Sequence, residues 1–303
     1  MPYLYLLGAV GFVASANIIA SFYNRKNEER KDPVPLYNLV YGIVVWLVWT
    51  VLYALDFSFE AGVLWYSLGF GVSYAVGVIG MIYALKGPVA LTSLIIQMSL
   101  IGTTVWGFMF WDAKFTPLVG VGLVLVVVSL FLCLYKGKQK ECDLCLYKNK
   151  KKEAEENKFS WSWLIAAICA FVGNAGCTII QRSQQTAFHG EHGNMLMSFA
   201  TLVSLLVSLV LYLRSDKSES KVICKSPSVA YPVFGGVSNL LLNVCVMKLA
   251  TSILLPSLVY PVIAVGGLAV VTLFSLFVFK EKMRWWQWLG IAIGAVAVGL
   301  LSL

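Results

Sequence analysis

Ten long apolar runs fill most of the chain, and they constrain its fold more than any other feature. Each run is close to the roughly 20 residues that a helix needs to cross the hydrocarbon of a bilayer. The runs are continuously apolar, whereas the strands of a membrane barrel alternate apolar and polar residues. We therefore predict an all-α membrane protein with ten transmembrane helices. The predicted spans are residues 3–23, 36–55, 62–85, 89–110, 116–135, 161–181, 194–213, 228–249, 254–279 and 285–302.

The composition favours lipid over water as the solvent of this chain. Hydrophobic residues make up 59% of it and charged residues only 13%, against about 25% charged residues in a soluble domain. The net charge of +8 comes from basic residues that lie between the apolar runs. Membrane lipids are therefore the expected partner of these charges, and no nucleic acid is expected. Residues 3–23 lack a basic start, so we expect a membrane helix there rather than a cleaved signal peptide.

A lysine-rich segment at 136–159 separates the first five runs from the last five. It contains eight lysines and is too polar to enter a bilayer. We therefore predict a first five-helix repeat at 1–135, a basic linker at 136–159 and a second five-helix repeat at 160–303.

The basic residues are distributed unevenly among the loops. Loops after odd-numbered spans hold 20 of the 23 Lys and Arg residues, and the other 3 lie after even-numbered spans or, for Lys248, at the end of one. Because basic loops stay in the cytoplasm, we expect the odd-numbered loops and the linker there and both termini outside.

Weak internal matches relate the two groups of five runs. Because five is an odd number, a second copy in the same chain enters the membrane upside down, as in the inverted repeats of many secondary transporters. The matching stretches are Gly11–Ala16 with Ala170–Ala175, Val51–Tyr53 with Val210–Tyr212, and Gly71–Tyr74 with Gly236–Asn239.

The runs contain no Asp or Glu, and apart from Lys248 at the end of the eighth run their polar side chains are neutral. Amides and phenols face lipid only at a cost of several kcal/mol, so we expect them to turn inward and line a hydrogen-bonding cavity. The alternative is that they only join packed helices. The candidate cavity residues are Asn17, Asn38, Tyr41, Tyr74, Gln97, Asn174, Gln181, Asn239, Asn243 and Tyr260.

Two lysines close to span ends are candidates for a charge at the cavity mouth. Lys86 ends the third run and Lys248 ends the eighth. Either could meet an anionic group, or simply extend to the lipid headgroups.

Neither a metal nor a cofactor is expected. Cys142 and Cys145 form a lone C-x-x-C without a second pair, and His189 and His192 lie in a polar loop with too few further ligands. We also expect no enzymatic activity, because the runs contain no clustered nucleophile, base or metal ligands.

Small residues mark places where helices approach closely. Gly69, Ser73 and Gly77 form a ridge in the third run, and Gly290 and Gly294 form a G-x-x-x-G motif in the tenth. Close packing within the chain explains both, and the second motif leaves a homodimer open.

Two patches resemble the drug/metabolite transporter superfamily, specifically its EamA-like ten-helix branch. The first is Tyr83–Leu94 and the second extends from Pro261 to Met283 and on to Trp288–Ile291. Lys280 stands where the family has glycine in its Gly-Glu turn, and the corresponding first-half turn at Trp111 is a weaker match. The resemblance implies a central cavity lined by helices 1–4 and 6–9, and export or exchange of small metabolites. We expect the protein in a bacterial plasma membrane. Its ten-helix members have cytoplasmic termini, whereas the charge bias here predicts external ones.

These observations predict a secondary transporter or facilitator of a small polar or zwitterionic solute, such as an amino acid, working by alternating access. One alternative is a flippase for a lipid-linked sugar. A second is a membrane sensor or scaffold that signals through the basic linker.

Overall fold

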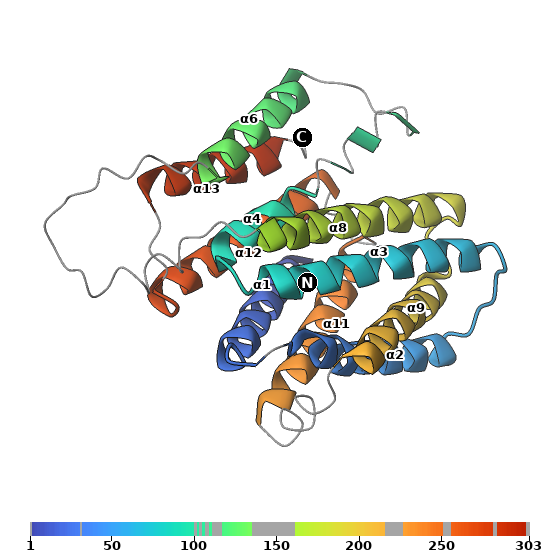
Figure 1. Cartoon of the computed structure of the whole chain (residues 1–303). Coiled ribbons are helices and arrows are strands. Elements are labelled where there is room, and N and C mark those ends of the chain that lie inside the picture. Colours follow the sequence, from blue (N-terminus) through green and yellow to red (C-terminus); the bar gives the residue numbers. More distant parts are fainter. Residues whose placement is uncertain are drawn as a thin grey trace, which may run out of the picture.

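The computed structural model describes residues 2–30, 32–99, 102, 105–106, 109–110, 117–134, 161–215, 227–250, 256–280 and 284–300. Within these ranges the regular structure is helical, without strands (Figure 1). The predicted linker at 136–159 lies outside them. The elements are α1 (Pro2–Lys26), α2 (Val34–Leu55), α3 (Val63–Ala84), α4 (Val89–Gln97), α6 (Pro117–Leu134), α8 (Trp161–Ala187), α9 (Gly193–Arg214), the 3₁₀ turn η1 (Pro227–Val229), α11 (Ala230–Ala250), α12 (Pro256–Phe277) and α13 (Trp285–Leu300).

Among the described helices, six segments are long and apolar enough to cross a membrane. They are α1, α2, α3, α8, α9 and the segment Pro227–Val246 of η1 and α11. Large apolar side chains point outward from them, including Leu7 at 70% exposure and Trp65 at 78%. Lipid can cover such a surface and water cannot. The predicted all-α class is therefore confirmed for the described residues, and the apolar helices indicate an integral membrane protein.

Proline and backbone geometry set the boundaries of several helices. Pro35 lies in the first turn of α2, where the missing N–H costs no hydrogen bond. Pro88 adopts an extended conformation, with φ −63° and ψ 114°, directly before α4. This proline therefore separates α3 from α4 at a tight turn.

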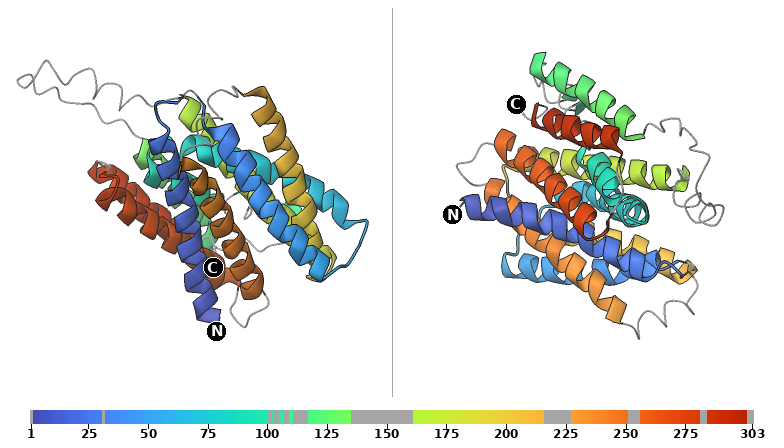
Figure 2. Two further views of the ribbon diagram at one scale, coloured as in Figure 1. Left: turned by 90° about the horizontal axis from the view of Figure 1, so that it is seen from below. Right: turned by 90° about the vertical axis from the view of Figure 1, so that its left-hand side faces the viewer.

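Helices from early and late parts of the chain lie side by side. The most extensive contacts join α3 with α8 and α1 with α11, and α2 packs on α9. Figures 1 and 2 show α6 and α13 together at one edge of the molecule, on the far side from α2 and α9. Between these edges α4 contacts both α12 and α8.

A close helix crossing joins α3 to α8 through glycine. A Cβ atom added to Gly173 would touch the backbone of Gly77 and come within 2.6 Å of the Ser73 carbonyl oxygen. A side chain at this position would therefore separate the two helices. The packing role predicted for the small-residue ridge of α3 is confirmed at Ser73 and Gly77.

The paired helices run antiparallel. Along α2 and α9, Thr50 bonds Ser198 with 3.1 Å between the hydroxyl oxygens, while Gly42 lies against Leu205. The residue number therefore rises along one helix as it falls along the other. The same holds for α3 and α8, where Gly80 lies against Ala170 and Gly69 against Ile180.

The glycine motif of α13 faces the interior of this chain. Gly294 packs against Leu94 of α4 and against Met98 directly after it, and Ser129 of α6 donates a hydrogen bond to the Gly290 carbonyl at 2.6 Å. This arrangement supports packing within the chain over dimerisation through Gly290 and Gly294.

Candidate functional site

A continuous chain of hydrogen bonds joins four of the predicted cavity residues across three helices. The hydroxyl oxygens of Tyr41 in α2 and Tyr74 in α3 are 2.9 Å apart. Tyr74 donates to Oδ1 of Asn239 in α11 at 2.8 Å. Nδ2 of Asn243 donates to the carbonyl oxygen and to Oδ1 of Asn239, at 2.8 and 3.0 Å. We call these four residues the Tyr–Asn chain.

Two members of the Tyr–Asn chain lie at the middle of their helices. Tyr74 is central in α3, which runs from Val63 to Ala84, and Asn239 is central in α11, which runs from Ala230 to Ala250. In a helix that spans a bilayer this position is close to the midplane. A hydrogen-bonding group there lies in a low-dielectric setting, where an unpaired polar group is costly.

Aromatic rings border the Tyr–Asn chain. Tyr37 stacks on Tyr41 with ring centroids 6.0 Å apart, and Phe70 stacks on Tyr74 at the same separation. Tyr41 is buried, whereas Tyr74, Asn239 and Asn243 are half-buried. The two asparagines of α11 therefore form a more accessible end of the Tyr–Asn chain than Tyr41 does.

Other predicted residues lie elsewhere in the bundle. Asn174 of α8 donates to the hydroxyl of Ser99, just beyond α4, at 2.6 Å. The Gln97 amide lies close to Gly267 of α12, beside Val13 of α1. These contacts join α4 to α8 and α12 without reaching the Tyr–Asn chain through a described hydrogen bond.

Asn17 and Asn38 are buried in α1 and α2. Both side-chain polar atoms of Asn38 lack a partner in the described part of the chain. Gln181 is half-buried in α8. Tyr260 lies in α12, and its side chain is outside what the structure describes.

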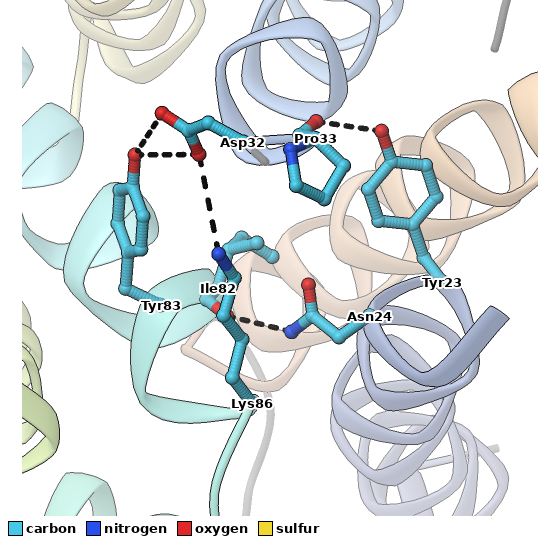
Figure 3. A network of polar contacts seen from close by, with 7 residues as sticks. All are labelled: Tyr23, Asn24, Asp32, Pro33, Ile82, Tyr83 and Lys86. Carbon is cyan, nitrogen blue, oxygen red and sulfur yellow. Dashed lines mark hydrogen bonds and ion pairs between the residues drawn. The ribbon is translucent and has the colours of Figure 1, made fainter. Parts of the chain in front are cut away.

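Lys86 belongs to a separate polar network at the C-terminal end of α3 (Figure 3). Its Nζ lies 3.9 Å from Oδ1 of Asp32 and 4.8 Å from the centroid of the Tyr83 ring. The Tyr83 hydroxyl donates to the Asp32 carboxylate at 3.0 to 3.1 Å. The network ties the turn between α1 and α2 to the end of α3.

Two backbone-directed bonds strengthen the same junction. Asn24 donates from Nδ2 to the Ile82 carbonyl at 2.7 Å, and Tyr23 donates to the Pro33 carbonyl at 2.6 Å (Figure 3). Burial lowers the pKa of Lys86 and the Asp32 carboxylate opposes that shift. The lysine predicted as a mouth charge therefore has an intramolecular counter-ion, while Lys248 is exposed near the end of α11.

Sequence reasoning did not single out Asp32 or Tyr83 as partners of Lys86. Tyr83 and Lys86 are three residues apart, a spacing that places neighbours on one helix face. Asp32 lies in a loop, and the orientation of its side chain depends on how α1 packs against α3.

No three His, Cys, Asp or Glu side chains gather closely enough to hold a metal ion in the ranges that the structure covers. Cys142 and Cys145 lie outside those ranges.

No protein-family model and no curated protein matches the chain. Among solved structures 26 chains match it. One is described only as the crystal structure of a protein, and it matches with a TM-score of 0.56 at 11% identity over 97% of this chain and 98% of its own. At this identity the likeness concerns the fold alone, and it extends over nearly the full length of both chains.

Proposed function

We propose that the protein is a secondary transporter or facilitator for a small polar or zwitterionic solute, working by alternating access. The observation that carries the proposal is the Tyr–Asn chain. Its side chains are neutral, it joins three helices, and Tyr74 and Asn239 lie at the middle of α3 and α11. Transporter sites occupy this depth because there they can open in turn to either side.

We also propose ten spans arranged as two inverted repeats at 1–135 and 160–303. The helix pairing supports this arrangement. In the proposed repeats α1 corresponds to α8, α2 to α9, α3 to α11, α4 to α12 and α6 to α13. If each helix is replaced by its counterpart, the contact of α1 with α11 becomes the contact of α8 with α3, which the structure also contains. The same exchange returns the contacts of α2 with α9, α4 with α12 and α6 with α13 to themselves.

Two pairs of equivalent residues give independent support. Tyr74 and Asn239, which bond each other, are 165 residues apart, the offset of the matching stretches that contain them. A Cβ at Gly71 of α3 would meet the Ala200 carbonyl oxygen at 2.5 Å and Val203 Cβ at 2.6 Å.

Gly236 of α11, again 165 residues after Gly71, packs in the same way on the other repeat. Its added Cβ would meet the Tyr41 carbonyl oxygen at 3.3 Å and Val44 at 3.2 Å. The residues that the two glycines meet correspond as well. Ala200 follows Tyr41 by 159 residues, and Val203 follows Val44 by the same number.

The neutral chemistry of the Tyr–Asn chain favours an uncharged or zwitterionic solute over an ion. Donors and acceptors can replace the hydration of polar groups, whereas no carboxylate in the predicted spans could carry a proton or sodium ion. The resemblance to the drug/metabolite transporter superfamily leads to the same proposal.

The test is uptake of radiolabelled solutes into liposomes that contain the purified protein. The panel comprises L-serine, L-leucine, L-glutamine and L-glutamate. Tyr74→Phe breaks the Tyr–Asn chain at its centre and should slow uptake about tenfold or more. Tyr66→Phe, the same substitution about two turns away on α3, should leave uptake close to that of the wild type.

Uptake of no panel member by folded wild-type protein would argue against this proposal. Equal uptake by the Tyr74→Phe variant would remove the Tyr–Asn chain from the proposed site.

A further inference from the structure

One backbone carbonyl fixes the orientation of the amides in the Tyr–Asn chain. The Asn239 carbonyl oxygen can only accept a hydrogen bond, so the Asn243 atom that lies 2.8 Å from it must be the amide nitrogen. That nitrogen also lies 3.0 Å from the Asn239 side chain. The Asn239 atom facing it must therefore be the acceptor, Oδ1.

The direction of every other bond in the chain follows. Because Oδ1 of Asn239 is an acceptor, the Tyr74 hydroxyl must donate its single proton there. Tyr74 then has no proton for Tyr41, so Tyr41 donates to Tyr74. The two lone pairs of Asn239 Oδ1 are both occupied, one by Tyr74 and one by Asn243.

Hydrogen-bonding capacity of opposite kinds remains on neighbouring turns of α11. The Asn239 NH₂ group retains two donors, and Asn243 Oδ1 retains its acceptor sites, because no described side chain bonds either atom. Both residues are half-buried, so the rest of the described chain leaves part of their surface uncovered.

We propose that Asn239 and Asn243 recognise a planar group that carries an acceptor beside a donor, namely a carboxamide. The ligand carbonyl accepts from the Asn239 NH₂ group, and the ligand N–H donates to Asn243 Oδ1. The inference rests on the proposed transport function and narrows its solute class to neutral amides and amide-bearing amino acids.

The same pair of asparagines disfavours a carboxylate in this position. A carboxylate has only acceptors, so one of its oxygens would face the Asn243 carbonyl oxygen without a proton between them. Burying an unpaired charged acceptor costs more than burying a paired neutral one. Aromatic stacking beside the site, at Phe70 and Tyr74, suits a flat group as well.

The test compares matched ligands on the wild-type protein in two experiments. Thermal shift is measured in detergent, and competition for solute uptake is measured in liposomes. L-Glutamine and L-asparagine should raise the melting temperature and compete for uptake. L-Glutamate and L-aspartate, which match them in size, should bind about tenfold more weakly or worse. This comparison needs no variant and so does not depend on how a variant folds.

Asn239→Asp provides a second measurement. The substitution keeps the acceptor that Tyr74 and Asn243 use and removes the two donors that face the ligand. We expect glutamine to lose its thermal shift on this variant. Gln287→Glu is the matched control, because it changes an amide to an acid at the start of α13 and keeps the acceptor for the Arg284 N–H.

Glutamate binding as tightly as glutamine would overturn the inference. Uptake of serine or leucine without uptake of either amide would overturn it too, while leaving the transport proposal in place. Uptake of no solute in the panel would instead count against both.

Discussion

Lys86 illustrates how one side chain can balance burial against a counter-ion. Its ammonium group lies over the Tyr83 ring and 3.9 Å from the Asp32 carboxylate. Burial is the larger influence, and it lowers the Lys86 pKa from the ordinary value of 10.5 despite the nearby acid. Because 39% of the lysine side chain remains exposed, solvent screens the ion pair and limits its effect on stability.

The lowered pKa of Lys86 sets a testable pH dependence. Between that pKa and 10.5 the unfolded chain binds a proton that the folded protein has released. The free energy of unfolding should therefore rise with pH in this window, and Lys86→Gln should remove that contribution. Asp32→Asn removes the opposing influence, so it should lower the Lys86 pKa further and widen the window.

The measurement is the melting temperature of the detergent-purified protein across the alkaline range. Wild type and Lys86→Gln giving parallel curves throughout would contradict the prediction.

At the scale of elements, several helices were predictable and their partners were not. The single helix predicted at 89–110 was wrong, because α4 ends at Gln97 and a turn follows at Met98 and Ser99. Continuous apolar runs predicted α2 and α3 to within two residues of the observed ends, because hydrophobicity alone decides what enters lipid. The predicted end at residue 181 was too early for α8, which continues through polar residues to Ala187. Hydropathy reports where a helix leaves the apolar layer, whereas the hydrogen bonds of the helix continue into the polar region.

The candidate site was predictable in composition but only partly in geometry. The cost of exposing amides and phenols to lipid selected Tyr41, Tyr74, Asn239 and Asn243, and the structure brings these together. The same cost also selected Asn174, which joins a different pair of elements. The free-energy cost of exposing a polar side chain to lipid predicts that the side chain turns inward. The packing of neighbouring helices determines which group it then bonds.

The crossing of α3 and α8 gives a prediction at the element scale. Gly173→Ala places a methyl group against the backbone of Gly77 and should lower the free energy of unfolding by about 1–3 kcal/mol. Gly11→Ala is the control, since a Cβ there meets nothing within 4 Å. It should be neutral or stabilise the helix by up to about 1 kcal/mol.

Reversible unfolding in detergent and denaturant measures both glycine variants. Equal stability of the two would mean that the α3–α8 crossing can move apart without cost.

At the scale of the whole molecule, charge predicts the orientation in the membrane. Loops after odd-numbered spans hold 20 of the 23 basic residues, including the eight lysines of the linker. Each further basic residue on one side raises the cost of the opposite orientation. The predicted topology places the Asp32–Tyr83–Lys86 network on the same side as the linker, because Asp32 follows the first predicted span and Lys86 follows the third.

Reporter fusions test this orientation. A reporter active only in the cytoplasm should work when inserted in the linker at residues 136–159 and fail when fused after Leu303. A reporter active only outside should give the opposite pattern. Cytoplasmic activity at both positions would contradict the external C-terminus predicted by the charge bias.

The bond between Tyr74 and Asn239 has a consequence for how such a molecule can specialise. In a symmetric dimer of identical subunits, a residue on the twofold axis meets its own copy, so a phenol would face a phenol and an amide would face an amide. A single continuous polypeptide is free of that restriction. It can place a hydrogen-bond donor opposite an acceptor at equivalent positions of its two halves. The pair then has a donor side and an acceptor side, which exact twofold symmetry does not allow.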